Sequence, residues 1–593
     1  MQNTIHSLEA LFAVNAFRIP QYQRAYSWEE SPQLEAFLED LRQQVGTQTK
    51  SPTKHYFLGT FLLHEEEIGG GRRTVNIVDG QQRMTTAVVF IATALRLQAM
   101  GKVAFTKEKP ALLHRNFVND EVTGCQKFHT IQEDDPFFQS EILGISASAC
   151  ELDSPSSRRL QEAVAFFTRE VAAEEWESLI YALKTAKVMV YAVASAEDAT
   201  QIFELQNDRG KRLTSLEALK SFLMHCIYIH SVSNADDRLS PLQTQFSNIF
   251  RSIEGLTVWK RTPGEDQVLA YHCAAFLPWS DREAYNKPKQ LVKATIKSMN
   301  GPSVITWIEK FVGSLVMSYG TMKDIFARRD ELPEFSELLL LNRMASFWPL
   351  ILKAWRYDKS ADKIEFLKTC RLLEVFTFRG YAMANLRTDT SLSSFHTTAR
   401  DFAGDFANLF NQLSGMSNWH NIESRFIAGL DNPYFFQEEG GDAHYLLWRY
   451  ENHLRGKPGK IQPLLSWRDF VEPRSYAAKF SVEHVAAQDH PIADTTVTWG
   501  DGEPQPFHAL ALNRLGNLVI DSISPNASKG KKDFAGKLKS LSETSIYLSQ
   551  GELVNFLKDR DVLVWDVEAI RARHEHLIAF ARKMWNPSTW HKP

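Results

Sequence analysis

Hydrophobic and polar positions along the chain change their period several times, first between residues 56 and 100. Residues 56–63 and 74–78 are apolar, β-branched runs of strand length separated by Gly69-Gly70-Gly71, so they predict a hairpin. From Met84 to Met100 the apolar positions repeat with helical spacing. Asp79-Gly80 lies between the second strand and this helix. The stretch is therefore predicted to form a strand, a tight turn and a helix.

The first fifty residues predict helices around an irregular segment. Residues 1–14 have the spacing of a short amphipathic helix. Pro20 disfavours a helix through the aromatic segment that follows it, and Ser27 is a suitable N-cap for a helix over residues 33–44. The pattern from 107 to 200 is mainly helical and closes with an apolar strand at 188–193.

The second half of the chain is helical at first and then mixed. Long helical repeats rich in Leu, Phe and Trp fill residues 231–435, which we interpret as a helical spacer or dimerisation region. Beyond it come a helix near 444–455, strands at 480–485 and 515–520, and a basic, helical-looking segment opened by Pro525. We expect an α+β, multidomain protein with domains at 1–230, 231–435 and 436–593.

Composition narrows the class of protein. A chain of 593 residues is too long for one core, and 44% hydrophobic and 23% charged residues describe an ordinary globular protein. The net charge of −4 excludes a strongly basic nucleic-acid binder, so any DNA contact must come from local patches. Five dispersed cysteines without a CxxC pair argue against a cysteine zinc site. The chain has neither a signal-like N-terminus nor an apolar run of membrane-spanning length, so we expect a cytoplasmic protein with no membrane partner.

Polar residues gather where the predicted strand enters the helix. Gln81, Gln82 and Arg83 lie at the helix start, where unpaired N–H groups and a partial positive charge favour phosphate oxygens. The simpler interpretation is that these three are polar surface residues of a turn between a strand and a helix. Two further polar stretches, and a glycine inside a strand that often marks a close approach, favour a nucleotide site. The candidate residues are Tyr22, Gln23, Arg24, Gly59, Asp79, Gly80, Gln81, Gln82, Arg83, Thr85, Asn207 and Arg209.

The C-terminal part holds an ordered set of polar residues that suits phosphodiester hydrolysis. His484 is a candidate general base, since imidazole titrates near neutral pH. Glu483 and the amide oxygen of Asn526 are candidate ligands for a hard divalent cation, Mg²⁺ or Mn²⁺. Asn517 is expected to orient the loop or the imidazole, and Lys529 or Lys537 to contact the DNA backbone. A lone Glu-His pair more often has a structural role, so the prediction of a nuclease site depends on the complete ordered set of residues.

These motifs together resemble a known family. Residues 19–28, 57–60, 77–86 and 203–213 resemble the ParB-like N-terminal domain of GmrSD-type modification-dependent restriction enzymes. Residues 482–488 and 515–529 resemble their C-terminal His-Me finger, or HNH, nuclease domain, a ββα-metal fold. One departure is that Val485-Ala486-Ala487 follows His484, where the family commonly has Ile-x-Pro. The fused single-chain layout also resembles a phage-defence member of the family.

The resemblance implies a nucleotide-dependent type IV restriction endonuclease. It would bind and hydrolyse a nucleoside triphosphate (ATP, GTP, CTP or UTP) and cleave double-stranded phage DNA carrying hydroxymethylated or glucosylated cytosine. Two alternatives stay open: a nucleotide-switched DNA-binding or partner-recruiting defence module without nuclease activity, and a phosphorothioate-sensing nicking enzyme. A homodimer is expected only from the long helical middle.

Overall fold

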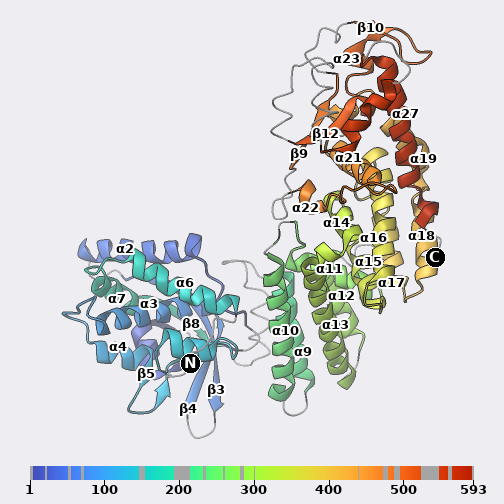
Figure 1. Ribbon diagram of the computed structural model, residues 1–593. Coiled ribbons are helices and arrows are strands. Elements are labelled where there is room, and N and C mark those ends of the chain that lie inside the picture. The colour runs from blue at the N-terminus through green and yellow to red at the C-terminus, as the bar shows by residue number, and fades with distance from the viewer. Residues whose placement is uncertain are drawn as a thin grey trace. The chain divides into compact units, whose positions relative to one another are not determined.

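The computed structural model divides into two compact units, one of residues 1–254 and 289–316, the other of residues 255–288 and 317–593 (Figure 1). It describes residues 4–20, 23–50, 55–68, 72–145, 154–192, 214–231, 235–257, 259, 261–280, 286–299, 301–438, 440–471, 479–486, 495–522, 546–557 and 564–590. No helix within these ranges is both long and apolar enough to cross a membrane.

A mixed six-stranded sheet organises the first unit, in the strand order β1-β8-β3-β4-β2-β7. Strands β3 and β4 form the predicted antiparallel hairpin, and β8 runs parallel to β3. β2 lies parallel to both β4 and β7, so these pairs need crossovers. The strands are β1 (Thr4–Ser7), β2 (Ala16–Arg18), β3 (Phe57–Ile68), β4 (Arg72–Asp79), β7 (Phe128–His129) and β8 (Lys187–Ala192).

Helix α3 (Gln81–Ala99) is the central helix of this unit, and residues 84–94 of it are all buried. An almost uniformly apolar helix of this kind needs neighbours on every side. Trp176 and Phe167 are two of these neighbours, because their rings lie 4.8 and 5.0 Å from the ring of Phe90 on α3. The other helices of the unit are α1 (Leu8–Val14), α2 (Glu35–Lys50), α4 (Pro110–Phe117), α6 (Pro155–Glu170), α7 (Trp176–Lys184), α9 (Ser215–His230) and most of α10 (Ala235–Thr257).

The predicted helix over residues 1–14 is wrong at residues 4–7. Thr4–Ser7 forms strand β1, antiparallel to β8, and the helix begins only at Leu8. The Ser7 hydroxyl caps it by accepting from the Ala10 N–H at 3.2 Å. The helical spacing of residues 1–14 did not exclude a strand at residues 4–7. Pairing with the edge strand β8 satisfies the backbone N–H and C=O groups of these residues as well as a helix would. The helix expected at 33–44 spans Glu35–Lys50 and follows a π-helical turn at Glu30–Leu34.

Helices dominate the second unit (Figure 1). They are α11 (Glu265–Phe276), α14 (Pro333–Leu340), α15 (Trp348–Tyr357), α16 (Ile364–Phe376), α17 (Leu392–Asp401), α18 (Phe406–Met416), α19 (Ile422–Leu430), α20 (Phe435–Glu438), α21 (Gly440–Arg455), α22 (Trp467–Phe470), α23 (Phe507–Leu510), α26 (Leu548–Gly551) and α27 (Val567–Met584). Helix α12 (Pro288–Lys297) and α13 (Pro302–Ala327) extend across the division in the chain.

A buried carboxylate joins distant helices of the second unit. Glu374 of α16, which is 0% exposed, accepts from the Tyr445 hydroxyl and the Trp585 indole N–H, both at 2.7 Å. Arg371 bonds Glu374 at 3.2 Å and pairs with Glu337 of α14. Because each charge is paired or hydrogen-bonded, this burial is tolerated, and it fixes the helical middle to the C-terminal segment.

The second unit also contains a short antiparallel pair, β9 (Phe480–His484) and β12 (Leu518–Ser522), with His484 opposite Leu518. The strand expected at 515–520 therefore begins three residues later, since Leu515–Asn517 forms a tight 3₁₀ turn. The small strands β10 (Thr496–Val497) and β11 (Gln505–Pro506) pair separately. The basic segment after Pro525 lies outside the described residues.

Candidate functional site

The N-terminal site is built around the start of α3. Gly80 stands at the helix N-cap with φ of 94°, a left-handed conformation that glycine adopts without a steric cost. A Cβ at this position would lie 2.5 Å from the Phe61 ring. Only glycine thus allows β4 to turn directly into α3, and the turn brings Asp79 and Arg83 close together at the sheet edge.

Arg83 lies across the backbone of β3. Its Nη1 donates to the Leu58 carbonyl at 3.1 Å and its Nη2 to the Thr60 carbonyl at 2.9 Å. A Cβ at Gly59, where φ is 119°, would overlap Nη1. The glycine inside the strand therefore marks a close approach, and the approaching group is Arg83. Burial lowers the pKa of Arg83, and the charge of Asp79, 3.8 Å away, opposes that shift.

Two glutamines hold the segment that follows Pro20. The Gln82 amide donates to the Ala25 carbonyl at 3.0 Å and accepts from the Ser27 N–H at 2.9 Å. Gln23, which is 0% exposed, donates to the Val78 carbonyl at 2.7 Å. These bonds satisfy backbone groups that have no ladder or helix partner. Both side chains thus position the loop against α3 and β4.

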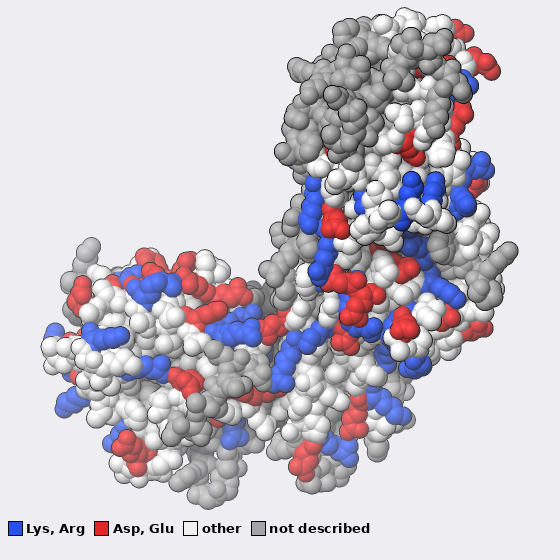
Figure 2. Space-filling model, viewed as in Figure 1, with Lys and Arg blue, Asp and Glu red and all other residues white. Residues whose placement is uncertain are grey.

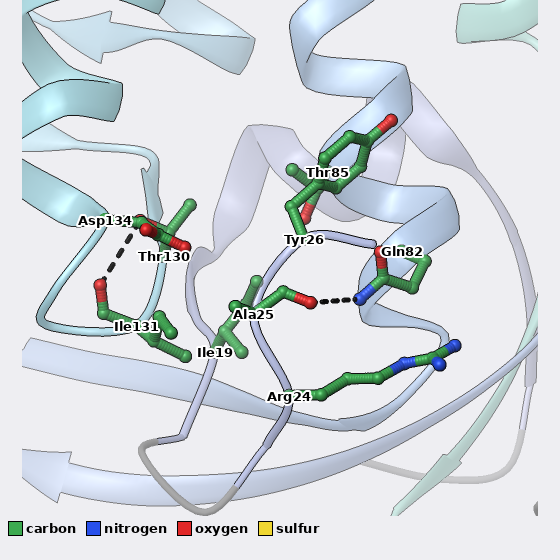
Figure 3. A pocket seen from close by; sticks show the side chains of 9 residues that line it. All are labelled: Ile19, Arg24, Ala25, Tyr26, Gln82, Thr85, Thr130, Ile131 and Asp134. Carbon is green, nitrogen blue, oxygen red and sulfur yellow. Dashed lines mark hydrogen bonds between the residues drawn. The ribbon is translucent and has the colours of Figure 1, made fainter. Parts of the chain in front are cut away.

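A small cavity opens beside this loop (Figure 3). The segment Arg24-Ala25-Tyr26 runs between Gln82 of α3 and the turn that carries Thr130 and Asp134. The cavity is small: the space it encloses is about that of one water molecule, far below the roughly 300–1,000 Å³ of most ligand pockets. Its lining residues are Ile19, Arg24, Ala25, Tyr26, Gln82, Thr85, Thr130, Ile131 and Asp134.

Charged groups of opposite sign surround the cavity. Burial lowers the pKa of Arg24, and the charges of Glu217 and Asp79 act against this shift. Burial raises the pKa of Asp134, although the Ser156 and Ser154 hydroxyls donate to its carboxylate at 2.6 and 2.9 Å. A buried carboxyl thus lies at the cavity, whereas the Arg24 side chain extends away from Thr130 and Asp134 (Figure 3).

The structure brings most of the predicted nucleotide-site residues together. Gln23, Arg24, Gly59, Asp79, Gly80, Gln81, Gln82, Arg83 and Thr85 all lie at or beside the start of α3. Tyr22, Asn207 and Arg209 lie outside the described residues. Sequence reasoning missed Thr130 and Asp134. Asp134 belongs to the acidic run Glu133-Asp134-Asp135, which is typical of a solvated surface. No local pattern indicated that one of these acids would be buried.

The C-terminal site centres on His484, the last residue of β9, which is 7% exposed. Its Nε2 lies 3.2 Å from Oδ1 of Asn513, and its ring meets the Phe436 ring edge to face at 4.5 Å. The Phe436 N–H in turn donates to the Asn513 carbonyl at 3.0 Å. Neither Asn513 nor Phe436 was predicted. Asn513 stands only four residues before Asn517, and that proximity was the one available signal.

Asn517 fixes the backbone immediately after His484. Its Oδ1 accepts from the Ala486 N–H at 2.8 Å and from the Trp565 indole at 3.0 Å, while its Nδ2 donates to the Leu512 carbonyl at 2.8 Å. The side chain is 0% exposed. Because His484 lacks the following proline common in the family pattern, this amide supplies the loop geometry through hydrogen bonds.

The donor set for a cation is only partly described. Glu483 is 5% exposed in β9, whereas Asn526 and Lys529 lie outside the described residues. Within the described ranges no group of three or more His, Cys, Asp or Glu side chains could hold a metal ion. A magnesium-type cation commonly uses one or two carboxylates, with waters and substrate phosphates as its other ligands. The chemistry of Glu483 fits such a cation.

Comparison with protein families matches both ends of the chain. Residues 8–224 match the model described as "GmrSD restriction endonuclease, N-terminal domain", and residues 425–580 match "GmrSD restriction endonucleases, C-terminal domain". The protein is therefore a restriction endonuclease of mixed α+β, mainly helical, multidomain architecture. More narrowly, the chain belongs to the GmrSD family, the type IV enzymes that act on modified DNA. A search of curated proteins found no match. The alternative of a defence module without nuclease activity is set aside.

Proposed function

We propose that this enzyme cleaves double-stranded phage DNA containing hydroxymethylated or glucosylated cytosine, with His484 as the general base, and that a nucleoside triphosphate bound at the start of α3 controls the cleavage. The observation that carries the catalytic part is the setting of His484: a nearly buried imidazole, held by Asn513 and Phe436, within the matched nuclease domain. A nearly buried histidine with a fixed ring suits proton transfer, because its orientation is set before the substrate binds.

His484 would take the proton from a water that attacks the scissile phosphorus, and the 3′ or 5′ oxygen leaves with the cut strand. Asn517 keeps the backbone after His484 in place. Mg²⁺ or Mn²⁺, held by Glu483 and Asn526, would supply stabilisation of the charge on the phosphate and the leaving oxygen. Lys529 is proposed to contact the DNA backbone. Together with β9 and β12 this assignment corresponds to a ββα-metal, HNH-type domain.

The nucleotide part rests on the cluster at the start of α3, proposed as a ParB-like site. Arg24 is one of the residues that line the cavity, and the α3 N-terminus contributes a partial positive charge. Gln23, Gln82 and Arg83 shape the site by bonding the backbone around it. Because the enclosed space is only about that of one water molecule, we expect a nucleotide to present no more than its phosphate end to these residues.

A cleavage assay tests the catalytic assignment. The purified enzyme is incubated with Mg²⁺ or Mn²⁺, with and without each nucleoside triphosphate, on unmodified, hydroxymethylated, glucosylated and phosphorothioate DNA. We expect fragments only from the two modified-cytosine substrates. His484→Ala should abolish cleavage, whereas His508→Ala, at an exposed histidine of the same domain, should leave it unchanged. Full cleavage by His484→Ala would refute the base, and nicking of only phosphorothioate DNA would replace the proposed substrate.

Equilibrium binding of labelled nucleotide tests the second site. Arg24→Gln should weaken binding about tenfold, since one charge-assisted contact to phosphate contributes on the order of 1.5 kcal/mol. Arg115→Gln is a matched control at an arginine outside the cavity lining. Unchanged affinity in Arg24→Gln, with the fold intact by circular dichroism, would remove Arg24 from the site. Hydrolysis is measured separately as phosphate release.

A further inference from the structure

The connection between α21 and α22 has an unusual surface. All residues from Gly456 to Leu464 are exposed, and Ile461 is 96% exposed. The sequence here is Gly-Lys-Pro-Gly-Lys-Ile-Gln-Pro-Leu, with two lysines and no acidic residue. An isoleucine held almost wholly in water loses the free energy of burial that such side chains usually gain. Together with Leu464, which is 62% exposed, Ile461 gives the loop two exposed apolar side chains beside its two lysines.

The base of this loop, residues 456–464, is firmly anchored. The Asn452 side chain donates to the Leu465 carbonyl at 2.9 Å and accepts from the Leu465 N–H at 2.8 Å. Arg455, held by Glu451 at 2.7 Å, donates to the Pro463 carbonyl at 2.9 Å. Two prolines, and Gly459 with φ of 83°, restrict or define the turn. The exposed tip is thus presented by a fixed frame.

The surroundings of the loop are electropositive. Burial lowers the pKa of His453, and interactions with Lys457, Lys583 and His576 lower it further, which places the two lysines near one point of the surface. Figure 2 shows basic and acidic side chains interspersed over the visible face of the protein, in keeping with the net charge of −4. The loop 456–464 differs from this mixed surface, because it carries two lysines and no acidic residue.

The loop also belongs to the nuclease domain. It lies within the matched residues 425–580, and it leads through α22 towards the strand that ends at His484. The Lys479 N–H, just before β9, donates to the Phe470 carbonyl at the end of α22 at 2.9 Å. The partner that this domain is known to meet is DNA, which is polyanionic and has base steps that exposed isoleucines enter in other DNA-binding proteins.

We infer that the loop 456–464 is a DNA-binding element, in which Lys457 and Lys460 contact phosphates and Ile461 inserts against the bases. Lys583 extends the phosphate-contacting surface. The lysines give affinity that does not depend on sequence, whereas the isoleucine wedge would unstack a base step and help the enzyme to reach a modified base. This inference depends on the DNA substrate of the family and not on the role of His484.

The test is the binding of the full-length enzyme to a fluorescent 30-bp duplex, with EDTA replacing the divalent cation so that no cleavage occurs. Affinity is measured from 50 to 200 mM salt on unmodified and glucosylated duplexes. Losing two phosphate contacts should reduce the slope of log K against log salt by about 1.8. The wild type should then lose about twelvefold more affinity than Lys457→Gln/Lys460→Gln over this range. Lys102→Gln/Lys107→Gln, at exposed lysines of the first unit, is the charge-matched control and should keep the wild-type slope.

Ile461→Ser tests the wedge. It should weaken binding about tenfold without changing the salt slope, because it removes an apolar contact and no charge. The side chain has no packing partners to lose at 96% exposure, so the melting temperature should stay unchanged. Wild-type affinity and slope in the loop variants would overturn the inference, and a protein partner would then be the better explanation for the surface. His484→Ala should bind DNA normally, which separates this result from any failure of the proposed catalytic base.

Discussion

The contact between Gly59 and Arg83 gives the sharpest quantitative prediction. Gly59→Ala would place a methyl group where Nη1 of Arg83 lies and would force a residue with a Cβ into φ of 119°. The Arg83 side chain is 31% exposed, so it can move into solvent, but it then gives up its bonds to the Leu58 and Thr60 carbonyls. The substitution thus has two separable costs, backbone strain and a lost contact.

Both costs can be estimated from the geometry. Strain at a positive φ costs about 1–3 kcal/mol for a residue other than glycine. Two bonds from a charged donor would contribute about 3 kcal/mol or more if fully buried, and we take about 2 kcal/mol because the guanidinium is partly in water. Gly59→Ala should therefore cost about 3–5 kcal/mol and Arg83→Ala about 2 kcal/mol. The double variant should cost no more than Gly59→Ala alone, which gives a coupling of about 2 kcal/mol.

Native-state hydrogen exchange measures these values locally. Amides of β3 and of the first turns of α3 report the free energy of opening of this region without unfolding the second unit. A coupling of about 2 kcal/mol corresponds to a roughly thirtyfold difference in protection between the observed and the additive double variant. Amides of α27 serve as the internal control and should exchange at the same rate in all four proteins.

Additive costs, within about 0.5 kcal/mol, would refute the reasoning, since they would mean that Gly59 and Arg83 do not share a contact. A stability of Gly59→Ala equal to that of the wild type would refute the strained conformation as well.

Three further predictions concern single polar side chains. Gln82→Ala removes two bonds to the Ala25–Ser27 segment and should destabilise the first unit by about 2–3 kcal/mol, read from hydrogen exchange; an unchanged rate at Ser27 would contradict it. Asn517→Asp keeps the acceptor for Ala486 and Trp565 but loses the donor to Leu512, so it should cost about 2–4 kcal/mol by chemical denaturation and reduce cleavage while DNA binding persists; full cleavage would show that the loop does not depend on this amide. Burial raises the pKa of Glu177, yet the N–H groups of Glu108, Lys107 and Thr106 and the Thr106 hydroxyl outweigh it and bring the pKa to about 2. Its contribution to stability is therefore present above its unfolded pKa, about 4.3, and is lost as the pH falls towards 2. Protection at residues 106–108, measured as the exchange rate relative to the intrinsic rate at each pH, should therefore fall over this window in the wild type and lose that dependence in Glu177→Gln.

The sequence by itself determined features that depend on neighbouring residues. The hairpin of β3 and β4, the turn at Gly80, helix α3 and strand β9 follow from period and turn chemistry, and the structure contains each of them. The family motifs were also readable, because they are short and nearly continuous. The local pattern gave the wrong element where it allowed two. Thr4–Ser7 was predicted as helix but is a strand that pairs with β8, and Leu515–Asn517 was predicted as strand but forms a turn before β12.

Only the tertiary structure decided what the polar side chains do. Arg83 and Gln82 were expected to face a ligand, and they bond backbone groups 23 to 57 residues away. Asp134 and Asn513 were not predicted, although one lines the N-terminal cavity and the other contacts His484. The physical reason is that period and turn residues act over a few positions. Which side chain meets which across a sheet edge or a helix start depends on strand order and register, which are fixed by the packing of the whole domain.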